Sequence, residues 1–112
     1  MKFKLFFTDY AQNKHVRSDY ADPATLNEVI SCMTLRLREP DNFVGIIDSD
    51  NVILQFMVED DGTICIDAPI DERKGSYSKH ATLDECITLV KSLSDKINPD
   101  QIEGLSFKLW GR

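Results

Sequence analysis

Few side chains in this 112-residue chain could carry out covalent chemistry: two histidines, His15 and His80, and three cysteines, Cys32, Cys65 and Cys86. A Cys–His nucleophile pair is compatible with this set, because such partners need not be close in sequence. All three cysteines, however, lie in or beside apolar patterns, where burial disfavours the thiolate. Both histidines fall in polar stretches that we expect to be loops. We therefore predict no catalytic residue, and a small hydrolase or transferase acting through His80 is the remaining enzyme alternative.

Motifs that would bind a cofactor or metal are also missing. The sequence contains no GxSxG, HExxH, GxGxxG or glycine-rich phosphate loop, and no CxxC pair. Asp48-Ser49-Asp50 resembles the opening of a calcium loop, but the later ligands and the glutamate at position twelve are absent. These observations predict a non-enzymatic protein with no cofactor and no metal.

Acidic residues are concentrated in one part of the chain. Residues 42–72 hold eight of them and no Lys or Arg, namely Asp48, Asp50, Glu59, Asp60, Asp61, Asp67, Asp71 and Glu72. The whole chain has a net charge of −6, so the other residues together are slightly basic. This charge argues against binding to nucleic acid or to an anionic membrane. Two interpretations remain open: turn chemistry combined with solubility, or a surface that binds a basic protein partner.

Two helices are predicted from apolar spacing and from residues that begin and end helices. Asp22-Pro23 is expected to open the first helix, which ends near Arg38 ahead of Pro40. Its apolar stripe consists of Leu26, Val29, Ile30, Met33 and Leu37. Thr82 and Glu85 fit a capping box for the second helix. The apolar face of that helix runs from Leu83 to Ile97, and Asn98-Pro99 ends it.

The predicted strands cover residues 2–8, 43–47, 52–59, 63–70 and 105–109, with polar connections at 9–21 and 71–81. The three middle strands should form an antiparallel meander, because turn residues separate them. The order is β-α-β-β-β-α-β in a single α+β domain, residues 1–112, with a mainly antiparallel sheet and both helices on one face.

Register can be predicted for the second hairpin of the meander. A three-residue loop, Asp60-Asp61-Gly62, places Val58 opposite Ile64 and matches the apolar faces, with Gly62 in the left-handed conformation. Alternation then directs one set of residues toward the helices: Phe3, Leu5, Phe7, Phe43, Ile47, Leu54, Phe56, Val58, Ile64, Ile66, Leu105, Phe107 and Leu109.

The opposite sheet face is expected to be apolar too. Its residues are Phe6, Val44, Ile46, Ile53, Met57, Cys65 and Trp110, interrupted by Lys4, Gln55 and Lys108. A patch of this kind exceeds what a soluble monomer normally exposes. A helix or loop of the same chain covers it, or a second copy does. The second possibility gives an alternative function, a homodimeric structural or regulatory domain.

The cellular location follows from short apolar runs and the cysteine content. No run approaches the roughly 20 residues of a membrane span. No small-residue cleavage site follows the basic amino-terminal residues MKFK, so we expect no signal peptide. An odd number of cysteines without CxxC spacing fits reduced, buried thiols in the cytoplasm.

One stretch resembles a known family. From Asn42 the chain reads NFVGIIDSDNVILQFMVEDDGTICIDAPI, followed by KGSYSKHATLDECITLVKSL up to Leu93. This succession of strands, acidic-Gly turn, GSY-type loop and Leu/Ile-rich helix resembles small immunity proteins of bacterial polymorphic toxin systems, particularly those beside deaminase or nuclease toxins. The resemblance implies a cytoplasmic, non-enzymatic inhibitor that binds and neutralises a toxin domain. It assigns no individual binding residue.

Overall fold

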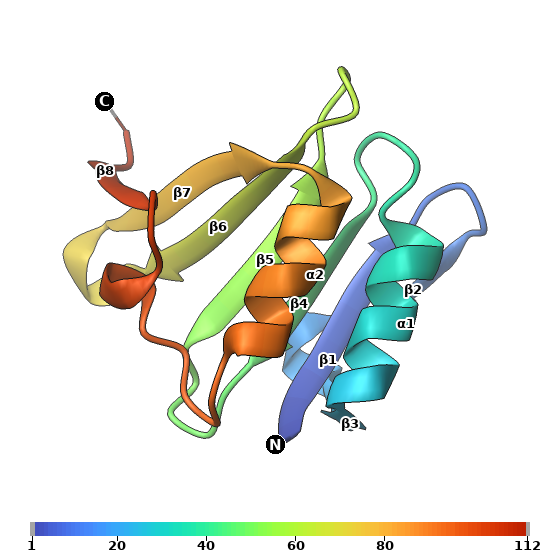
Figure 1. The fold of residues 1–112 in the computed structure, drawn as a ribbon, viewed down its shortest axis with the longest axis horizontal. Coiled ribbons are helices and arrows are strands. Elements are labelled where there is room, and N and C mark those ends of the chain that lie inside the picture. Colours follow the sequence, from blue (N-terminus) through green and yellow to red (C-terminus); the bar gives the residue numbers. More distant parts are fainter. Residues whose placement is uncertain (1, 112) are drawn as a thin grey trace.

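The computed structural model describes residues 2–111, which form one antiparallel sheet with two helices on one face (Figure 1). The strands are β1 (Lys2–Asp9), β2 (Lys14–Val16), β3 (Asp22–Thr25), β4 (Phe43–Ile47), β5 (Ile53–Val58), β6 (Ile64–Ile70), β7 (Gly75–Ala81) and β8 (Ser106–Leu109). The helices are α1 (Leu26–Arg36) and α2 (Leu83–Ser92), with short 3-10 helices η1 (Ser18–Tyr20), η2 (Asp71–Arg73) and η3 (Pro99–Gln101). The predicted α+β class is confirmed.

The strands lie in the order β2-β1-β4-β5-β6-β7-β8, and β3 also pairs with β1. Since β4 occupies one edge of β1, strands β2 and β3 share its other edge, at residues 7–9 and 2–5 respectively. Helices α1 and α2 lie side by side across the sheet (Figure 1). No helix among residues 2–111 has the length and apolar character that a bilayer crossing requires.

The core lies between these helices and the sheet. Val29 and Met33 of α1 and Cys86 and Val90 of α2 are buried there. They pack against apolar side chains of the central strands, chiefly Val44, Ile46, Leu54, Phe56, Ile64 and Ile66. The predicted apolar stripes of both helices are therefore confirmed as their packing faces.

The start of α1 was predicted wrongly. Asp22 and Pro23 belong to β3, an edge strand, where the missing N–H of proline is tolerated. The helix begins after Thr25, whose hydroxyl accepts from the Glu28 N–H while the Glu28 carboxylate accepts from the Thr25 N–H. This capping box satisfies two backbone donors, which a single Asp cap would not.

The capping box of α2 was predicted correctly, but the helix is shorter than expected. Thr82 and Glu85 make the reciprocal bonds, and the helix ends at Ser92. Ile97, placed by its spacing on the helix face, lies in the following loop and is still buried. Its backbone N–H donates to the Asp48 carboxylate at 2.9 Å, which fixes the loop against the β4–β5 turn.

The register of the second hairpin is as predicted. Val58 is opposite Ile64, and Phe56 is opposite Ile66. Gly62 has a φ of +88°, the left-handed conformation that a residue with a side chain rarely adopts. The loop therefore sets a register in which apolar side chains of both strands point to the helix face.

The face assignment of β4 was wrong by one residue. Val44 pairs with Phe56 and Ile46 pairs with Leu54, so both lie under the helices and are fully buried. Phe43 and Ile47 therefore lie on the opposite face, contrary to the prediction. Five consecutive nonpolar residues, Phe43–Ile47, give no alternation by which to choose a face, so the pairing with β1 and β5 decides it.

Three strands were not predicted. β2 and β3 lie in or next to the expected connection 9–21, and β7 takes up most of the expected loop 71–81. Their side chains are largely polar, but each strand pairs with a more apolar neighbour, β1 or β6. Tertiary pairing outweighs weak local preference in such strands.

A buried polar network joins β1, α1 and the segment before β4. The Asp9 carboxylate accepts from the Arg36 guanidinium at 2.9 Å and from the Asn42 amide at 3.0 Å. The same amide group of Asn42 donates to the Arg36 carbonyl, and its oxygen accepts from the Tyr10 N–H. Both Asp9 and Asn42 are almost fully buried, so this network substitutes for the water they lose.

Candidate functional site

A hollow of about 660 Å³ opens at one end of the sheet, beside the β5–β6 hairpin. Its lining carries four acidic side chains, Asp41, Glu59, Asp60 and Asp61, and one imidazole, His80. Met57, Val58 and Thr63 complete the lining, which contains no Lys or Arg among the described residues. The β5–β6 hairpin and the α1–β4 connection stand at the same end of the fold (Figure 1).

Local hydrogen bonds fix the conformation of the β5–β6 hairpin, which carries Glu59, Asp60 and Asp61. The Glu59 N–H donates to the Thr63 carbonyl, and the Gly62 N–H donates to the Glu59 carbonyl. Asp61 accepts from the Thr63 hydroxyl at 2.7 Å and from the Thr63 N–H at 3.0 Å. These bonds to the charged form lower the pKa of Asp61, with a smaller contribution from His80. The carboxylate of Asp61 is therefore held ionised in the hollow.

Asp41 reaches the hollow from the other side, although it was not among the predicted site residues. Its φ of +72° places it in the left-handed region, which Asp tolerates better than most residues. Its N–H donates to the Val58 carbonyl at 2.9 Å. Two loops that are distant in sequence thus line the acidic hollow.

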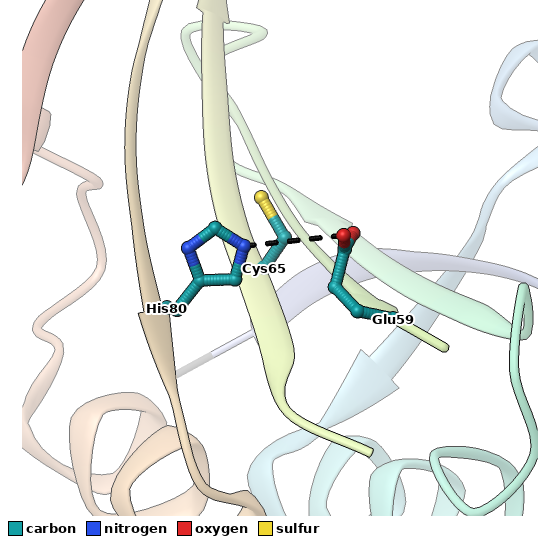
Figure 2. A group of neighbouring side chains, drawn as sticks. All are labelled: Glu59, Cys65 and His80. Atoms are coloured by element: carbon teal, nitrogen blue, oxygen red, sulfur yellow. Dashed lines mark ion pairs between the residues drawn. The ribbon is translucent and has the colours of Figure 1, made fainter. Parts of the chain in front are cut away.

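Glu59, Cys65 and His80 form a compact group inside this hollow and on the adjoining sheet face. Figure 2 shows the three side chains extending from the end of β5, from β6 and from β7. Cys65 and His80 are direct partners across the β6–β7 pair. One ligand atom from each of the three residues lies within 4.8 Å of the others. His80 Nε2 and a Glu59 carboxylate oxygen are 4.0 Å apart, beyond hydrogen-bond distance.

The surroundings of the Cys65 thiol favour its protonated form. Burial, and next the negative charges of Asp67 and Glu59, raise its pKa. Burial also raises the pKa of Cys32, and it raises that of Cys86 to about 12. A protonated thiol is weakly reactive. These pKa directions agree with the expectation that apolar surroundings disfavour the thiolate.

Other predicted acids serve the fold instead. Asp48 is only 4% exposed, and its carboxylate accepts from the N–H groups of Asp50, Val52 and Ile97. Asp50 forms an exposed ion pair with Lys96 at 3.0 Å. Asp48 has little surface to offer a partner, and Asp50 is partly neutralised.

The remaining acids are spread over the sheet. Asp67 lies in the middle of β6 and accepts from the Gln55 amide at 3.2 Å. Asp71 and Glu72 form η2 at the far end of β6, followed directly by Arg73 and Lys74. The eight predicted acids therefore do not form one surface. The structure brings together Glu59, Asp60 and Asp61, and adds Asp41.

The second sheet face exposes fewer apolar side chains than predicted, although Phe43 and Ile47 lie on it in place of Val44 and Ile46. Val44 and Ile46 lie on the helix face, so their assignment to this side was wrong. Phe6 is on the second face but buried, and the segment of η1 lies beside it. Ile53 is half-buried, while Met57 and Trp110 are 39% and 46% exposed.

Phe43, Met57 and Cys65 are neighbours across β4, β5 and β6 on this face, and Trp110 lies apart from them. The indole N–H of Trp110 donates to Ser76 near the far end of β7, whereas Met57 lies next to Cys65 on the neighbouring strand. A homodimer through this face stays a prediction, now with fewer exposed apolar residues to support it.

The two histidines lie on strands instead of loops. His80 is on β7, directed to the acidic hollow, and His15 is on β2 at the other edge of the sheet. Sequence reasoning missed the grouping of Glu59, Cys65 and His80, because their proximity depends on β7, which was expected to be a loop. The alternating pattern Ser76, Ser78, His80 was the one local signal of a strand.

Comparison of the chain with protein-family models, curated proteins and solved structures finds no match.

Proposed function

We propose that this protein is a non-enzymatic binding module that captures a basic protein partner through the acidic hollow. The observation that carries this proposal is the convergence of Asp41, Glu59, Asp60 and Asp61 on one concave surface whose lining contains no Lys or Arg among the described residues. Four carboxylates held at one place favour occupation by Lys or Arg side chains of another molecule.

The electrostatic reason is the field that a concave acidic surface produces. Like charges around a hollow with protein walls add to one another, attract cations and accelerate encounter with a basic surface. Asp60 and Asp61 are exposed at the hairpin tip, so they contact solvent and a partner directly. Such exposed charges chiefly raise the association rate and make it sensitive to salt.

The partner class follows from the resemblance of residues 42–93 to small immunity proteins. Within that resemblance the partner is a toxin domain, and the protein acts in the bacterial cytoplasm as its inhibitor. Toxins that act on nucleic acid carry basic surfaces for their own substrates. An acidic hollow that covers such a surface blocks access to the substrate.

Charge-reversal variants at the two ends of β6 test the proposal. Asp60→Lys/Asp61→Lys changes the charge in the hollow, and Asp71→Lys/Glu72→Lys makes the same change in net charge at the far end. Binding is measured with a labelled oligolysine peptide over a range of salt concentrations. The Asp61 carboxylate also accepts a hydrogen bond from the Thr63 hydroxyl, so the double variant loses a contact within the hairpin. The single variant Asp60→Lys keeps this contact, and a circular-dichroism spectrum checks that each variant remains folded.

The hairpin variant should bind at least about tenfold more weakly, a change of about 1.4 kcal/mol. Its affinity should also depend less on salt. The control variant Asp71→Lys/Glu72→Lys should bind the peptide with an affinity within about twofold of that of the original protein. Equal losses in both variants would mean that total charge alone attracts the peptide, and unchanged affinity in the hairpin variant would contradict the proposal directly.

A further inference from the structure

We propose that Glu59, Cys65 and His80 form a binding site for a divalent transition-metal ion of the zinc class. The side chains come from β6, from β7 and from the residue that follows β5, and they gather at one point on the second sheet face (Figure 2). Met57 pairs with Cys65, Cys65 pairs with His80, and Glu59 follows Met57 by two residues. Strand alternation therefore directs all three ligand-bearing side chains to the same face.

The spacing of the ligand atoms is close to that of an occupied site. Zinc binds nitrogen and oxygen at about 2.0–2.2 Å and sulfur at about 2.3 Å, so two atoms that share a tetrahedral ion lie about 3.3–3.8 Å apart. His80 Nε2 and the Glu59 oxygen are 4.0 Å apart, and all three ligand atoms lie within 4.8 Å of one another. Rotation of the three side chains has to supply the remaining approach, because Cys65 and His80 lie on strands paired in a fixed register.

The donor set selects the kind of metal. One sulfur, one imidazole nitrogen and one carboxylate oxygen match the ligands of zinc and of neighbouring first-row ions. The Cys65 thiol releases its proton to solvent as the metal–sulfur bond forms, so binding strengthens as the pH rises. Calcium and magnesium are disfavoured, because they require oxygen ligands almost exclusively. Three protein ligands leave a fourth tetrahedral position, and the His80 side chain is 60% exposed, so that position is open to water or to a group from another molecule.

The surroundings also favour a cation. Asp41, Asp60 and Asp61 line the same hollow, and their charges raise the local concentration of cations. The other potential sulfur and imidazole ligands lie elsewhere: Cys32 on α1, Cys86 in the core and His15 on β2. Among the described residues, the group at Glu59 is therefore the one that combines the three donor types. Metal binding here does not depend on the docking role proposed above.

Titration of the reduced, full-length protein with Co²⁺ and with Zn²⁺ tests the site. A Co²⁺–thiolate bond produces a charge-transfer band in the near ultraviolet, which reports directly on sulfur coordination. Zinc affinity and stoichiometry are measured by calorimetry. The variants are Cys65→Ser, His80→Gln and Glu59→Gln, and the matched controls are Cys32→Ser and His15→Gln.

The protein should bind one equivalent of zinc and show the cobalt band. Cys65→Ser should abolish the band, while Cys32→Ser and His15→Gln should keep it. Loss of a direct ligand should weaken zinc binding by about 100-fold or more, since even changes beyond the ligands cost about 10–100-fold. Absence of the band in the original protein, or an equal loss in the controls, would overturn the site.

A second measurement avoids reliance on variants that fail to fold. Each cysteine of the unaltered protein is alkylated with and without zinc, and the labelled positions are found by mass spectrometry. Zinc should slow the labelling of Cys65 and leave that of Cys32 unchanged. Equal labelling of Cys65 with and without zinc would contradict the proposal.

Discussion

The ring of Phe6 occupies the space directly over Gly45, its partner on the neighbouring strand. A Cβ atom at residue 45 would overlap the tip of that ring. Phe43, the next residue on this face of β4, meets the same ring edge to face, with centroids 6.4 Å apart. The Phe6 ring therefore fills the space that a side chain at residue 45, in the middle of β4, would occupy.

Substitution of Gly45 by alanine should destabilise the protein. The added methyl group forces the Phe6 ring out of a position that is only 4% exposed, and overpacking of this kind costs about 1–3 kcal/mol. Urea denaturation measures the change in the free energy of unfolding. The double variant Gly45→Ala/Phe6→Leu should recover part of the loss, because the smaller side chain relieves the overlap. Additive effects of the two substitutions would show that Phe6 and Gly45 do not interact in this way.

Substitution of Asp48 by alanine should reduce stability much more than substitution of Asp50. The Asp48 carboxylate accepts three backbone N–H groups, and one of them, from Ile97, is buried. Each buried donor left without a partner costs about 1–3 kcal/mol. The exposed Asp50–Lys96 pair contributes about 0–1 kcal/mol. Thermal and urea unfolding of Asp48→Ala and Asp50→Ala compare them, and similar losses in the two variants would count against this role of Asp48.

Acidification should weaken the protein partly through Asp9. The hydrogen bond from Arg36 lowers the pKa of Asp9 below its ordinary value of 3.8, with further contributions from Gln12 and Asn42. A carboxylate with a lowered pKa in the folded state stabilises that state at neutral pH. Its contribution decreases below about pH 4 and is lost once the pH passes the lowered pKa.

Urea midpoints measured between neutral pH and about pH 2 check this expectation. Asp9→Asn should be less stable at neutral pH and should lose less stability on acidification. A matched change at the exposed ion pair, Asp19→Asn, should follow the original protein. If Asp9→Asn and the original protein lose stability in parallel as the pH falls, Asp9 is not the titrating group.

The features that could be predicted from sequence are those set by neighbouring residues. The capping box at Thr82 and the register fixed by Gly62 depend on a few adjacent positions, and both were predicted correctly. The faces of β4 and the existence of β7 depend on pairing partners far along the chain, and both were predicted wrongly. A nonpolar strand such as β4 and a mostly polar strand such as β7 show too little apolar–polar alternation for such predictions.

The same distinction applies to the site. Local composition indicated the acids of the β5–β6 hairpin, because Asp and Gly are typical of tight turns. Local composition did not indicate that Asp41 lies beside these acids. The α1–β4 connection approaches the β5–β6 hairpin only because α1 packs on the sheet. Likewise, Cys65 and His80 become neighbours only through the β6–β7 pairing.

The position of β1 inside the sheet has a consequence for synthesis on the ribosome. β1 pairs with β2 and β3 through one edge, and these partners follow within a short stretch of chain. Its other edge pairs with β4, which is translated only after the whole of α1. During that interval the nascent chain presents an open row of N–H and C=O groups, the kind of edge at which two unfinished chains can pair wrongly.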